Sequence, residues 1–513
     1  MRTSRRRDDR GIHEPMINDR TGAATAAPVR RVSILIVGSG GNAIGVAALL
    51  ARAGHDDIAI MTKHGDFGGA WLQNTYPGCE VDSPSSVYQF EFDENPRWSS
   101  LFAGQQELLD YLRDVARRNG LYERAMFDTE LLDAHWSRDE RCWIIDSTHG
   151  TVTAAVLILA TGFLEEPVIP QIPGMDSFGG RIFHSSRWPA GYTGAGDRVA
   201  VVGSGSSAIQ IVPALTPHAA EVIQFQRTPT WVLPKQNRRL SAEEIDMLER
   251  SPAERQALRA EAQSEEERNW SAIFLALDDV AAREYEQLSR EFLHDQIADS
   301  QVRAHLTPGH PIGCKRPLVS DDYYGSLNAP NVRLVPSAVE SIGPRCVTTA
   351  DGDRFEADVI VLATGFYFGG HILDRVHRRD GLSVAALQQG RPRAYKAISV
   401  SGCPNLFLVG GAAPNGQIWN GLFPGQAAAP YIIGALDHLR EQGLVAIEVG
   451  EEAESDWKAQ ADELLDRGPT VIGGCHNYSQ DDTGRNKAAW PGSLESLRAA
   501  HSIFDPTDYF EVT

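Results

Sequence analysis

The sequence predicts an α/β protein of two doubly wound domains, the second inserted into the first, with a helical insertion in the second. Short apolar runs end in a glycine turn at four places, residues 32–40, 155–163, 198–205 and 358–366. A β-branched run of this kind indicates a buried parallel strand. The turns alternate in the order GSG, ATG, GSG, ATG. This internal repeat indicates two copies of one Rossmann-like, dinucleotide-binding fold.

The repeat also gives the expected domain boundaries. We expect residues 1–30 to be a disordered tail and residues 31–168 to form the first part of the first domain. Residues 169–330 then form the second domain. Residues 331–513 return to the first domain and continue as a C-terminal region, in which NLFLVGG, from Asn405, is expected to be a further strand of the first domain.

Residues 241–300 differ in composition, because they are rich in Glu, Arg, Ala and Leu and poor in Gly and Pro. Ser241 and Glu244 stand at the spacing of a capping box, which predicts the start of a helix. We therefore expect a helical insertion in the second domain. A solvated helical hairpin and a segment that lines the substrate site both fit this pattern.

Charge and hydropathy exclude two classes of partner. The 513 residues contain 48 Lys and Arg against 68 Asp and Glu, a formal net charge of −20. This charge repels nucleic acid and anionic membrane surfaces. The sequence has no run of 18 apolar residues, so no membrane span is expected.

The cysteines indicate no metal or redox motif. No CxxC pair occurs, so neither a zinc framework nor a redox dithiol is expected. A reducing, cytoplasmic setting is favoured, and no metal site is predicted. The chain's cysteines are Cys79, Cys142, Cys314, Cys346, Cys403 and Cys475.

The first glycine motif, GSGGNAIG, lies between a predicted strand and a predicted helix. Its Gly38, Gly40 and Gly45 are candidate cofactor residues, because glycine lets the backbone approach a pyrophosphate at the N-terminus of a helix. Ala43 takes the place of the third glycine. The next strand ends in Thr62, also a candidate, where a carboxylate would bind both ribose hydroxyls.

The second motif, GSGSSAIQ, has the same context, and its candidates are Gly203, Gly205, Ser206 and Ser207. The strand that follows ends in Arg227 and Thr228, where a site for NAD would carry an acid. Arginine there suits a ribose 2′-phosphate, so NADPH is favoured over NADH.

Two longer segments carry a family resemblance. GGAWLQNTYPGCEVD, residues 68–82, and FGGRIFHSSRWP, residues 178–189, resemble the two signatures of the type I Baeyer-Villiger monooxygenases. That family lies within the flavin-containing monooxygenase superfamily, and the chain resembles its actinobacterial-type branch most. The resemblance implies an oxidoreductase that uses FAD, NADPH and O2. It implies conversion of a ketone to an ester or lactone through a C4a-peroxyflavin.

The resemblance also implies roles for single residues. Arg316, in CKRP, matches the catalytic arginine, and Asp82 matches the acid that lies near that arginine and the flavin. Lys315 matches the lysine that binds the phosphate of NADPH. Further cofactor-binding positions match Gly69, Trp71, Tyr88, His184 and Trp188, of which the last two belong to the connection between the domains.

The chain departs from the family pattern at several places. Ala43, Thr62 and Ala70 change positions near the FAD, and residues 412–425 lack the usual continuation after NLFLVGG. These changes predict that the chain binds the adenosine or the pyrophosphate of FAD through rearranged contacts.

Three alternatives stay open. The first is oxygenation of sulfur or nitrogen in a small molecule such as a sulfide. The second is an NADPH-dependent flavin reductase or oxidase. The third is a flavin- or NADP-binding protein without turnover. The sequence predicts neither the substrate nor the oligomeric state.

Overall fold

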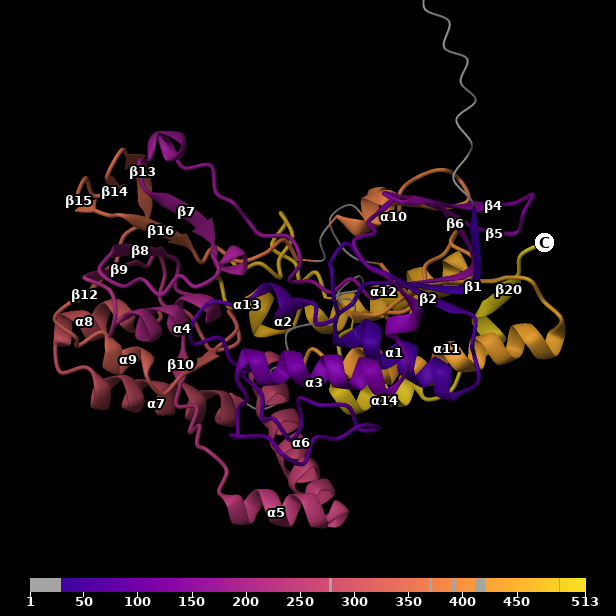
Figure 1. The fold of residues 1–513 in the computed structure, drawn as a ribbon, viewed down its shortest axis with the longest axis horizontal. Helices are drawn as coiled ribbons and strands as arrows, with labels where there is room; N and C mark the ends of the chain where they lie inside the picture. Colours follow the sequence, from indigo (N-terminus) through magenta and orange to yellow (C-terminus); the bar gives the residue numbers. More distant parts are fainter. Residues whose placement is uncertain (1–28, 276–278, 369–370, 389–392, 411–419, 489) are drawn as a thin grey trace, which may run out of the picture.

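The computed structural model describes residues 29–275, 279–368, 371–388, 393–410, 420–488 and 490–513. Residues 1–28, and with them almost all of the predicted tail, lie outside this part of the chain; Arg30 already begins the first strand. The chain forms two lobes, one built on a mixed sheet and the other on a parallel sheet (Figure 1).

The sheet of the first lobe has the order β17-β4-β5-β6-β1-β2-β3, and β18 pairs in parallel with β6. β1 pairs in parallel with both β2 and β6, while β4, β5 and β6 form an antiparallel meander. The strand predicted after Asn405 is therefore confirmed as part of this sheet. The strands are β1 (Arg30–Val37), β2 (Ile58–Met61), β3 (Ala125–Met126), β4 (Leu131–Ser137), β5 (Cys142–Ser147), β6 (Gly150–Leu159), β17 (Val376–His377) and β18 (Leu406–Leu408).

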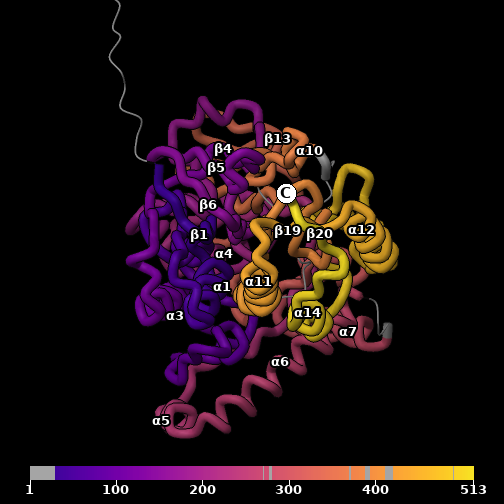
Figure 2. The backbone as a smooth tube through the Cα atoms, turned by 90° about the vertical axis from the view of Figure 1, so that its right-hand side faces the viewer, coloured from indigo at the N-terminus to yellow at the C-terminus, as the bar shows by residue number. Residues whose placement is uncertain are grey.

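Helices cover one face of this sheet. Ala47, Leu112 and Ile432, one from each of three helices, are completely buried in the core they share with β1. α14 (Leu494–His501) lies beside α11 (Phe423–Gln442), as Figure 2 shows. These helices are α1 (Gly41–Arg52), α3 (Gln105–Arg118), α11 (Phe423–Gln442) and α14 (Leu494–His501).

The sheet of the second lobe is wholly parallel, in the order β12-β9-β8-β16-β7. Ile211 of α4 packs on one face, and Val347 of a three-stranded antiparallel sheet packs on the other. The elements are β7 (Arg181–His184), β8 (Arg198–Val202), α4 (Ser206–Leu215), β9 (Glu221–Phe225), α9 (Tyr323–Ser326), β12 (Val332–Val335), β13 (Val339–Gly343), β14 (Cys346–Thr349), β15 (Arg354–Glu356) and β16 (Val359–Leu362).

The predicted return to the first domain at residue 331 comes too early in the chain. β16, the strand of the second ATG turn, lies between β8 and β7, so the chain leaves the second lobe only after it. The apolar run predicted a buried strand correctly. It could not identify the sheet, because any parallel sheet accepts such a run and pairing across the sequence decides which one.

The helical insertion contains α5, α6 and α7; α5 and α6 extend below the lobes in Figure 1, and α7 lies along the lower edge of the second lobe. The capping box is confirmed, since Ser241 accepts from the backbone of Glu244 and Glu244 accepts from the backbone of Ser241. Around it lie α5 (Ala242–Arg250), α6 (Pro252–Phe274), α7 (Asp279–Gln296), α8 (Ser300–Leu306), β10 (Val232–Leu233) and β11 (Leu318–Val319).

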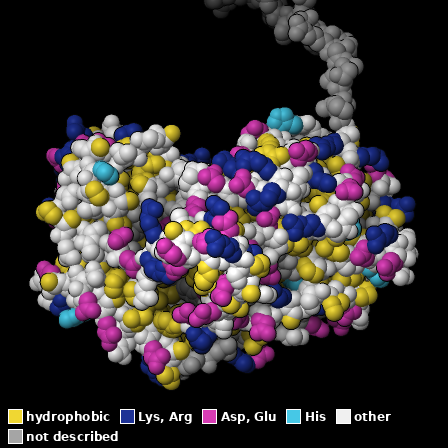
Figure 3. Space-filling model, turned by 60° about the horizontal axis from the view of Figure 1, so that its bottom comes forward, with side chains coloured by type: hydrophobic (Ala, Val, Ile, Leu, Met, Phe, Trp, Pro, Cys, Tyr) yellow, Lys and Arg dark blue, Asp and Glu magenta, His cyan; other side chains and the backbone are white. Residues whose placement is uncertain are grey.

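The remaining elements are short or belong to the C-terminal region. They are α2 (Ala70–Gln73), α10 (Val384–Gln388), β19 (Ile447–Val449), α12 (Glu451–Leu465), α13 (Pro469–Ile472) and β20 (Tyr509–Glu511). None of the helices described here combines the length and apolar character that crossing a membrane requires. Figure 3 shows acidic and basic side chains interspersed over one face of the molecule.

Candidate functional site

A cavity of about 730 Å³ lies between the two lobes and receives loops from the carboxyl ends of strands in both sheets. Ligands of open α/β sheets bind at these strand ends. The structure brings most of the candidate residues together here. Those that line the cavity are Gly38, Gly40, Thr62, Gly69, Trp71, Asp82, Tyr88, Gly205, Ser206, Ser207 and Arg316.

The two glycine turns have one geometry in both lobes. Gly38 has a φ of +128°, and a Cβ there would lie 2.3 Å from the carbonyl oxygen of Ala160. Gly203 has a φ of +132°, and its Cβ would lie 2.3 Å from the same atom of Ala363. Each first glycine therefore packs against the alanine of an ATG turn, which explains why the two motifs recur together.

Helix N-termini face the cavity behind these turns. Gly40 caps α1 and Gly205 caps α4, and neither cap uses a side chain. The backbone N–H groups of the first turn are thus available to an anion such as a pyrophosphate. Gly69 approaches the same point, since a Cβ on Gly69 would lie 2.6 Å from the Cα of Gly40.

Gly45 differs from the other glycines of its motif. It lies within α1, where a Cβ would come 3.0 Å from the ring of Phe90. It does not line the cavity. Its place in the motif reflects helix packing, and the sequence pattern alone does not separate packing from cofactor contact.

The cavity fits a dinucleotide in a further respect. The hydroxyl of Thr161, in the first ATG turn, is buried and has no hydrogen-bond partner among the described residues. Thr161 lines the cavity. A buried hydroxyl is normally satisfied, so this one suits a polar ligand group.

Arg316 and Asp82 form the ion pair at the centre of the site. Nη2 of Arg316 lies 2.9 Å from Oδ2 of Asp82 and donates a hydrogen bond to it. Burial favours the neutral carboxyl, but the charge and hydrogen bond of Arg316 outweigh it and hold the pKa of Asp82 below its ordinary value. The pair brings a fixed guanidinium to the cavity wall.

Glu266 is a neighbour of this pair that the sequence analysis missed. It projects from α6, is 9% exposed, and shares a side-chain hydrogen bond with Ser83. Burial raises the pKa of Glu266 to about 7, the charge of Asp82 acts in the same direction, and Arg316 opposes both. The helical insertion thus reaches the back of the ion pair, a placement that its polar composition did not reveal.

Lys315 and Arg227 lie close to each other in the second lobe, although neither lines the cavity. Burial lowers the pKa of Lys315, and the charge of Arg227 lowers it further. Two cations held together favour an anionic ligand between them, as a ribose 2′-phosphate would be. Thr228 is also outside the lining; its carbonyl accepts from the hydroxyl of Ser204 at 3.0 Å.

Trp71 and Tyr88 meet on the wall of the first lobe. The indole N–H of Trp71 donates to the Tyr88 hydroxyl at 3.1 Å, and the rings pack edge to face with centroids 5.7 Å apart. This contact holds both aromatic faces in fixed positions beside Asp82.

His184 and Trp188 lie outside the cavity lining, and their expected place in the connection between the domains is wrong: His184 ends β7 in the sheet of the second lobe, and Trp188 packs against the core of that lobe. Nδ1 of His184 accepts from the backbone N–H of Ser186, so Nε2 carries the proton and donates to the carbonyl of Gly365 at 3.0 Å. Burial lowers the pKa of His184 to about 4. The indole N–H of Trp188 donates to the carbonyl of Tyr192. A neutral His184 therefore ties the end of β7 to the second ATG turn, which follows the neighbouring strand β16.

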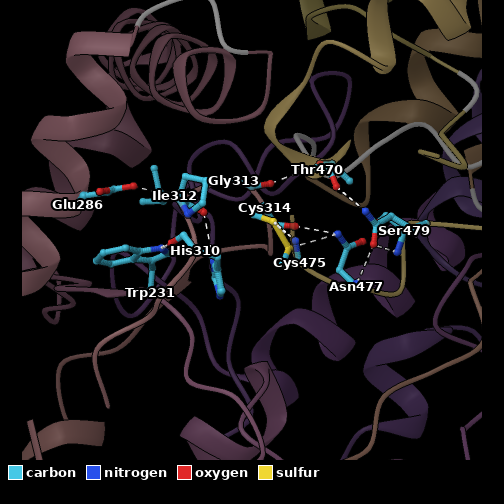
Figure 4. The surroundings of a disulfide bond; sticks show 12 residues. Trp231, Glu286, His310, Ile312, Gly313, Cys314, Thr470, Cys475, Asn477 and Ser479 are labelled. Carbon is cyan, nitrogen blue, oxygen red and sulfur yellow. Dashed lines mark hydrogen bonds between the residues drawn. A yellow bond between two sulfur atoms is a disulfide. The ribbon is translucent and has the colours of Figure 1, made fainter. Parts of the chain in front are cut away.

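The structure contains a disulfide that the sequence analysis did not predict. Cys314, which precedes Lys315, forms a disulfide with Cys475, 161 residues further along the chain (Figure 4). The sequence showed no pair because the two cysteines come from the second lobe and the C-terminal region. No short spacing connects them.

Hydrogen bonds hold the same turn on both sides, as Figure 4 shows. From the C-terminal region, Asn477 donates to the carbonyl of Cys314 at 2.7 Å and Thr470 donates to that of Gly313 at 3.3 Å. From α7, Glu286 accepts from the backbone of Ile312 at 2.8 Å. The turn that carries Arg316 is therefore fixed to two separate parts of the fold.

The predicted departure at 412–425 is only partly visible. Residues 411–419 lie outside the described residues. Asn420 is buried, and its side-chain oxygen accepts from the backbone of Leu422 and Phe423, where α11 begins.

Comparisons with known proteins agree with this geometry. A family model described as pyridine nucleotide-disulphide oxidoreductase matches residues 35–269. The chain is 35% identical to a Baeyer-Villiger monooxygenase of Streptomyces coelicolor, over 93% of this chain and 92% of the relative. It is 32% identical to another of Pseudomonas aeruginosa, over 95% and 93%.

Solved structures of one enzyme share the fold. A closed crystal structure of cyclohexanone monooxygenase superimposes with a TM-score of 0.84 at 26% identity, covering 95% of this chain and all of that one. The NADP+-bound enzyme from Rhodococcus sp. Phi1 has a TM-score of 0.83 at 25% identity and covers the same shares.

Removing the disulfide is expected to lower stability. Because Cys475→Ser opens a long covalent loop, we expect the unfolding free energy to fall by about 3 to 5 kcal/mol, seen as a lower melting temperature. Cys142→Ser, which removes a cysteine outside the disulfide, is the control. Alkylation of the wild type in denaturant, before reduction, should modify four cysteines. Modification of all six would contradict the disulfide.

Glu266 predicts a pH dependence of stability. The folded state keeps its proton up to a pKa of about 7, whereas the unfolded chain releases it near the ordinary value of 4.5. The unfolding free energy therefore falls as the pH rises from about 4.5 to about 7, and Glu266 causes no further change above that range. Glu266→Gln should flatten the melting temperature over this range, whereas Glu265→Gln, at its exposed neighbour, should not. Parallel curves for the wild type and Glu266→Gln would contradict the assignment.

Proposed function

This chain belongs to the Baeyer-Villiger monooxygenases, and on that premise we propose that Arg316 and Asp82 carry the oxygenation of a ketone in the cavity between the lobes. The protein is an FAD- and NADPH-dependent flavoprotein monooxygenase. The observation that supports the catalytic assignment is the 2.9 Å ion pair, which holds a guanidinium at the cavity wall.

FAD, when bound, supplies the electrons that activate O2. The side chains of the protein position the reactants and supply charge beside them. Arg316 offers N–H donors and a permanent positive charge to an anionic oxygen that forms beside it. Asp82 accepts one hydrogen bond from the guanidinium and fixes its direction. Because both groups lie in a partly enclosed cavity, their interaction is stronger than in bulk water.

The substrate class is a small ketone, with an ester or lactone as the product. Two similar structures of cyclohexanone monooxygenase are described as bound to cyclohexanone and to epsilon-caprolactone, a ketone and a lactone. We place the protein in the cytoplasm, where NADPH is supplied.

Arg316→Ala tests the catalytic assignment. We expect the variant to bind FAD and to oxidise NADPH, but to form ester about 10²- to 10³-fold more slowly, because the developing anion loses its donor. A panel of ketones and sulfides, with product mass and hydrogen peroxide measured together, checks this.

Arg345→Ala is the matched control, since Arg345 is exposed on the far side of the second lobe, where it pairs with Asp358 at 3.4 Å. Ester formation by Arg316→Ala at the wild-type rate would refute the role. Sulfide products without ester from the wild type would favour the alternative of sulfur oxygenation.

Arg227→Ala tests the choice of NADPH. Loss of a charge-assisted contact to the 2′-phosphate should raise the KM for NADPH about 10- to 100-fold and leave the KM for NADH unchanged. Arg333→Ala, at an exposed arginine of β12, serves as the control. Equal effects on both nucleotides, measured by steady-state oxidation, would argue against the assignment.

A further inference from the structure

The end of β2 raises a question about how FAD is held. Thr62 stands where the fold places a carboxylate for the adenosine ribose. Its hydroxyl lies 2.9 Å from the Ser39 hydroxyl and accepts from the backbone N–H of His64 at 3.2 Å. Thr62 is therefore engaged within the protein, and the ribose hydroxyls need another acceptor.

Glu165 supplies a carboxylate at the same strand end. It comes from the segment after the first ATG turn and lines the cavity together with Thr62. Its Oε1 lies 2.8 Å from Nζ of Lys63 and 3.1 Å from Nε2 of His64. Since Lys63 and His64 directly follow Thr62, these contacts hold the Glu165 carboxylate beside the end of β2.

Glu165 is ionised and keeps room for a ligand. Burial raises its pKa, but the hydrogen bonds and charges of His64 and Lys63 outweigh burial and lower it to about 2. Oε2 accepts from the side-chain amide of Gln73 at 2.9 Å. A carboxylate offers about four acceptor positions, and the three donors described here leave one for a hydroxyl in the cavity.

The other acids of this wall are engaged differently. Glu130 lines the cavity too, and the backbone N–H of its neighbour Thr129 donates to the carbonyl of Thr62, but Oε1 of Glu130 accepts from Arg375 at 2.6 Å. Glu166 is more exposed and faces His371 at 3.6 Å. Direct contact of its carboxylate with Lys63 and His64, the residues that follow Thr62, therefore favours Glu165.

We propose that Glu165 is the ribose-binding acid of the FAD site, carried on the first ATG segment in place of the end of β2. The inference rests on the proposed binding of FAD in this cavity, with its adenosine at the carboxyl end of β2. It explains how a chain with threonine at position 62 retains the adenosine: the carboxylate has moved about a hundred residues along the sequence and kept its place in the fold.

The experiment compares flavin binding in four variants, of which Glu130→Gln is described last. We expect Glu165→Gln to weaken FAD binding about 10- to 100-fold, because a charge-assisted acceptor is lost. Flavin fluorescence during release from the holoenzyme measures this. Glu166→Gln is the matched control and should bind FAD as the wild type does. Thr62→Glu added to Glu165→Gln should restore most of the affinity, since it returns a carboxylate to the strand end.

FMN separates the proposal from a structural role. FMN lacks adenosine, so its binding to the apoprotein should be equal in the wild type and Glu165→Gln. Equal loss of FAD and FMN, or no rescue by Thr62→Glu in a folded variant, would reduce Glu165 to a tie between segments and overturn the proposal.

Two further outcomes complete the test. A selective loss of FAD in Glu130→Gln, and not in Glu165→Gln, would also overturn the proposal, because it would place the ribose at Glu130. Flavin release does not depend on turnover. If the wild type retains FAD but forms no ester, the result counts against the proposed function and leaves the proposal for Glu165 standing.

Discussion

The ion pair between Arg316 and Asp82 joins the two lobes at the point where the chemistry is proposed. Asp82 belongs to the first lobe and Arg316 to a turn of the second. Two contacts run beside it: Tyr76 donates to Gln210 at 2.9 Å, and buried Lys235 pairs with Glu80 at 2.6 Å. A buried charge is costly unless paired, so these contacts favour the arrangement of lobes that encloses the cavity. The same ion pair therefore fixes the two lobes relative to each other and holds the guanidinium of Arg316 in place.

The parts of the site that the sequence predicted are those whose chemistry is local. Gly38 and Gly203 need a positive φ and room for a neighbouring backbone, and only glycine meets both conditions, so a short motif records them. Apolar runs followed by these turns predicted the strands of the two sheets, because the apolar character of a buried strand is also local in the sequence. The assignment of β16 to the wrong lobe shows the limit, because strand pairing is a long-range choice.

The features that the sequence did not reveal all come from distant segments. Glu165 meets Lys63, Glu266 meets Ser83, and Cys314 meets Cys475 only because the fold brings them together. Acids in a polar helix usually lie at the surface, and the spacing of scattered cysteines does not identify a disulfide partner, so the sequence carries no signal for these contacts. The departure at Thr62 was the one useful indication, because the absence of a carboxylate there implies that another residue binds the ribose hydroxyls.

The disulfide gives the turn of Arg316 a second kind of support. Hydrogen bonds from Thr470, Asn477 and Glu286 already orient the turn, and the covalent bond limits how far the C-terminal region can move from it. Tyr478, three residues beyond Cys475, lines the cavity, and its pKa responds to both Arg316 and Asp82. The covalent bond and the hydrogen bonds therefore act on the same turn, so this wall of the cavity and the guanidinium are held in one arrangement.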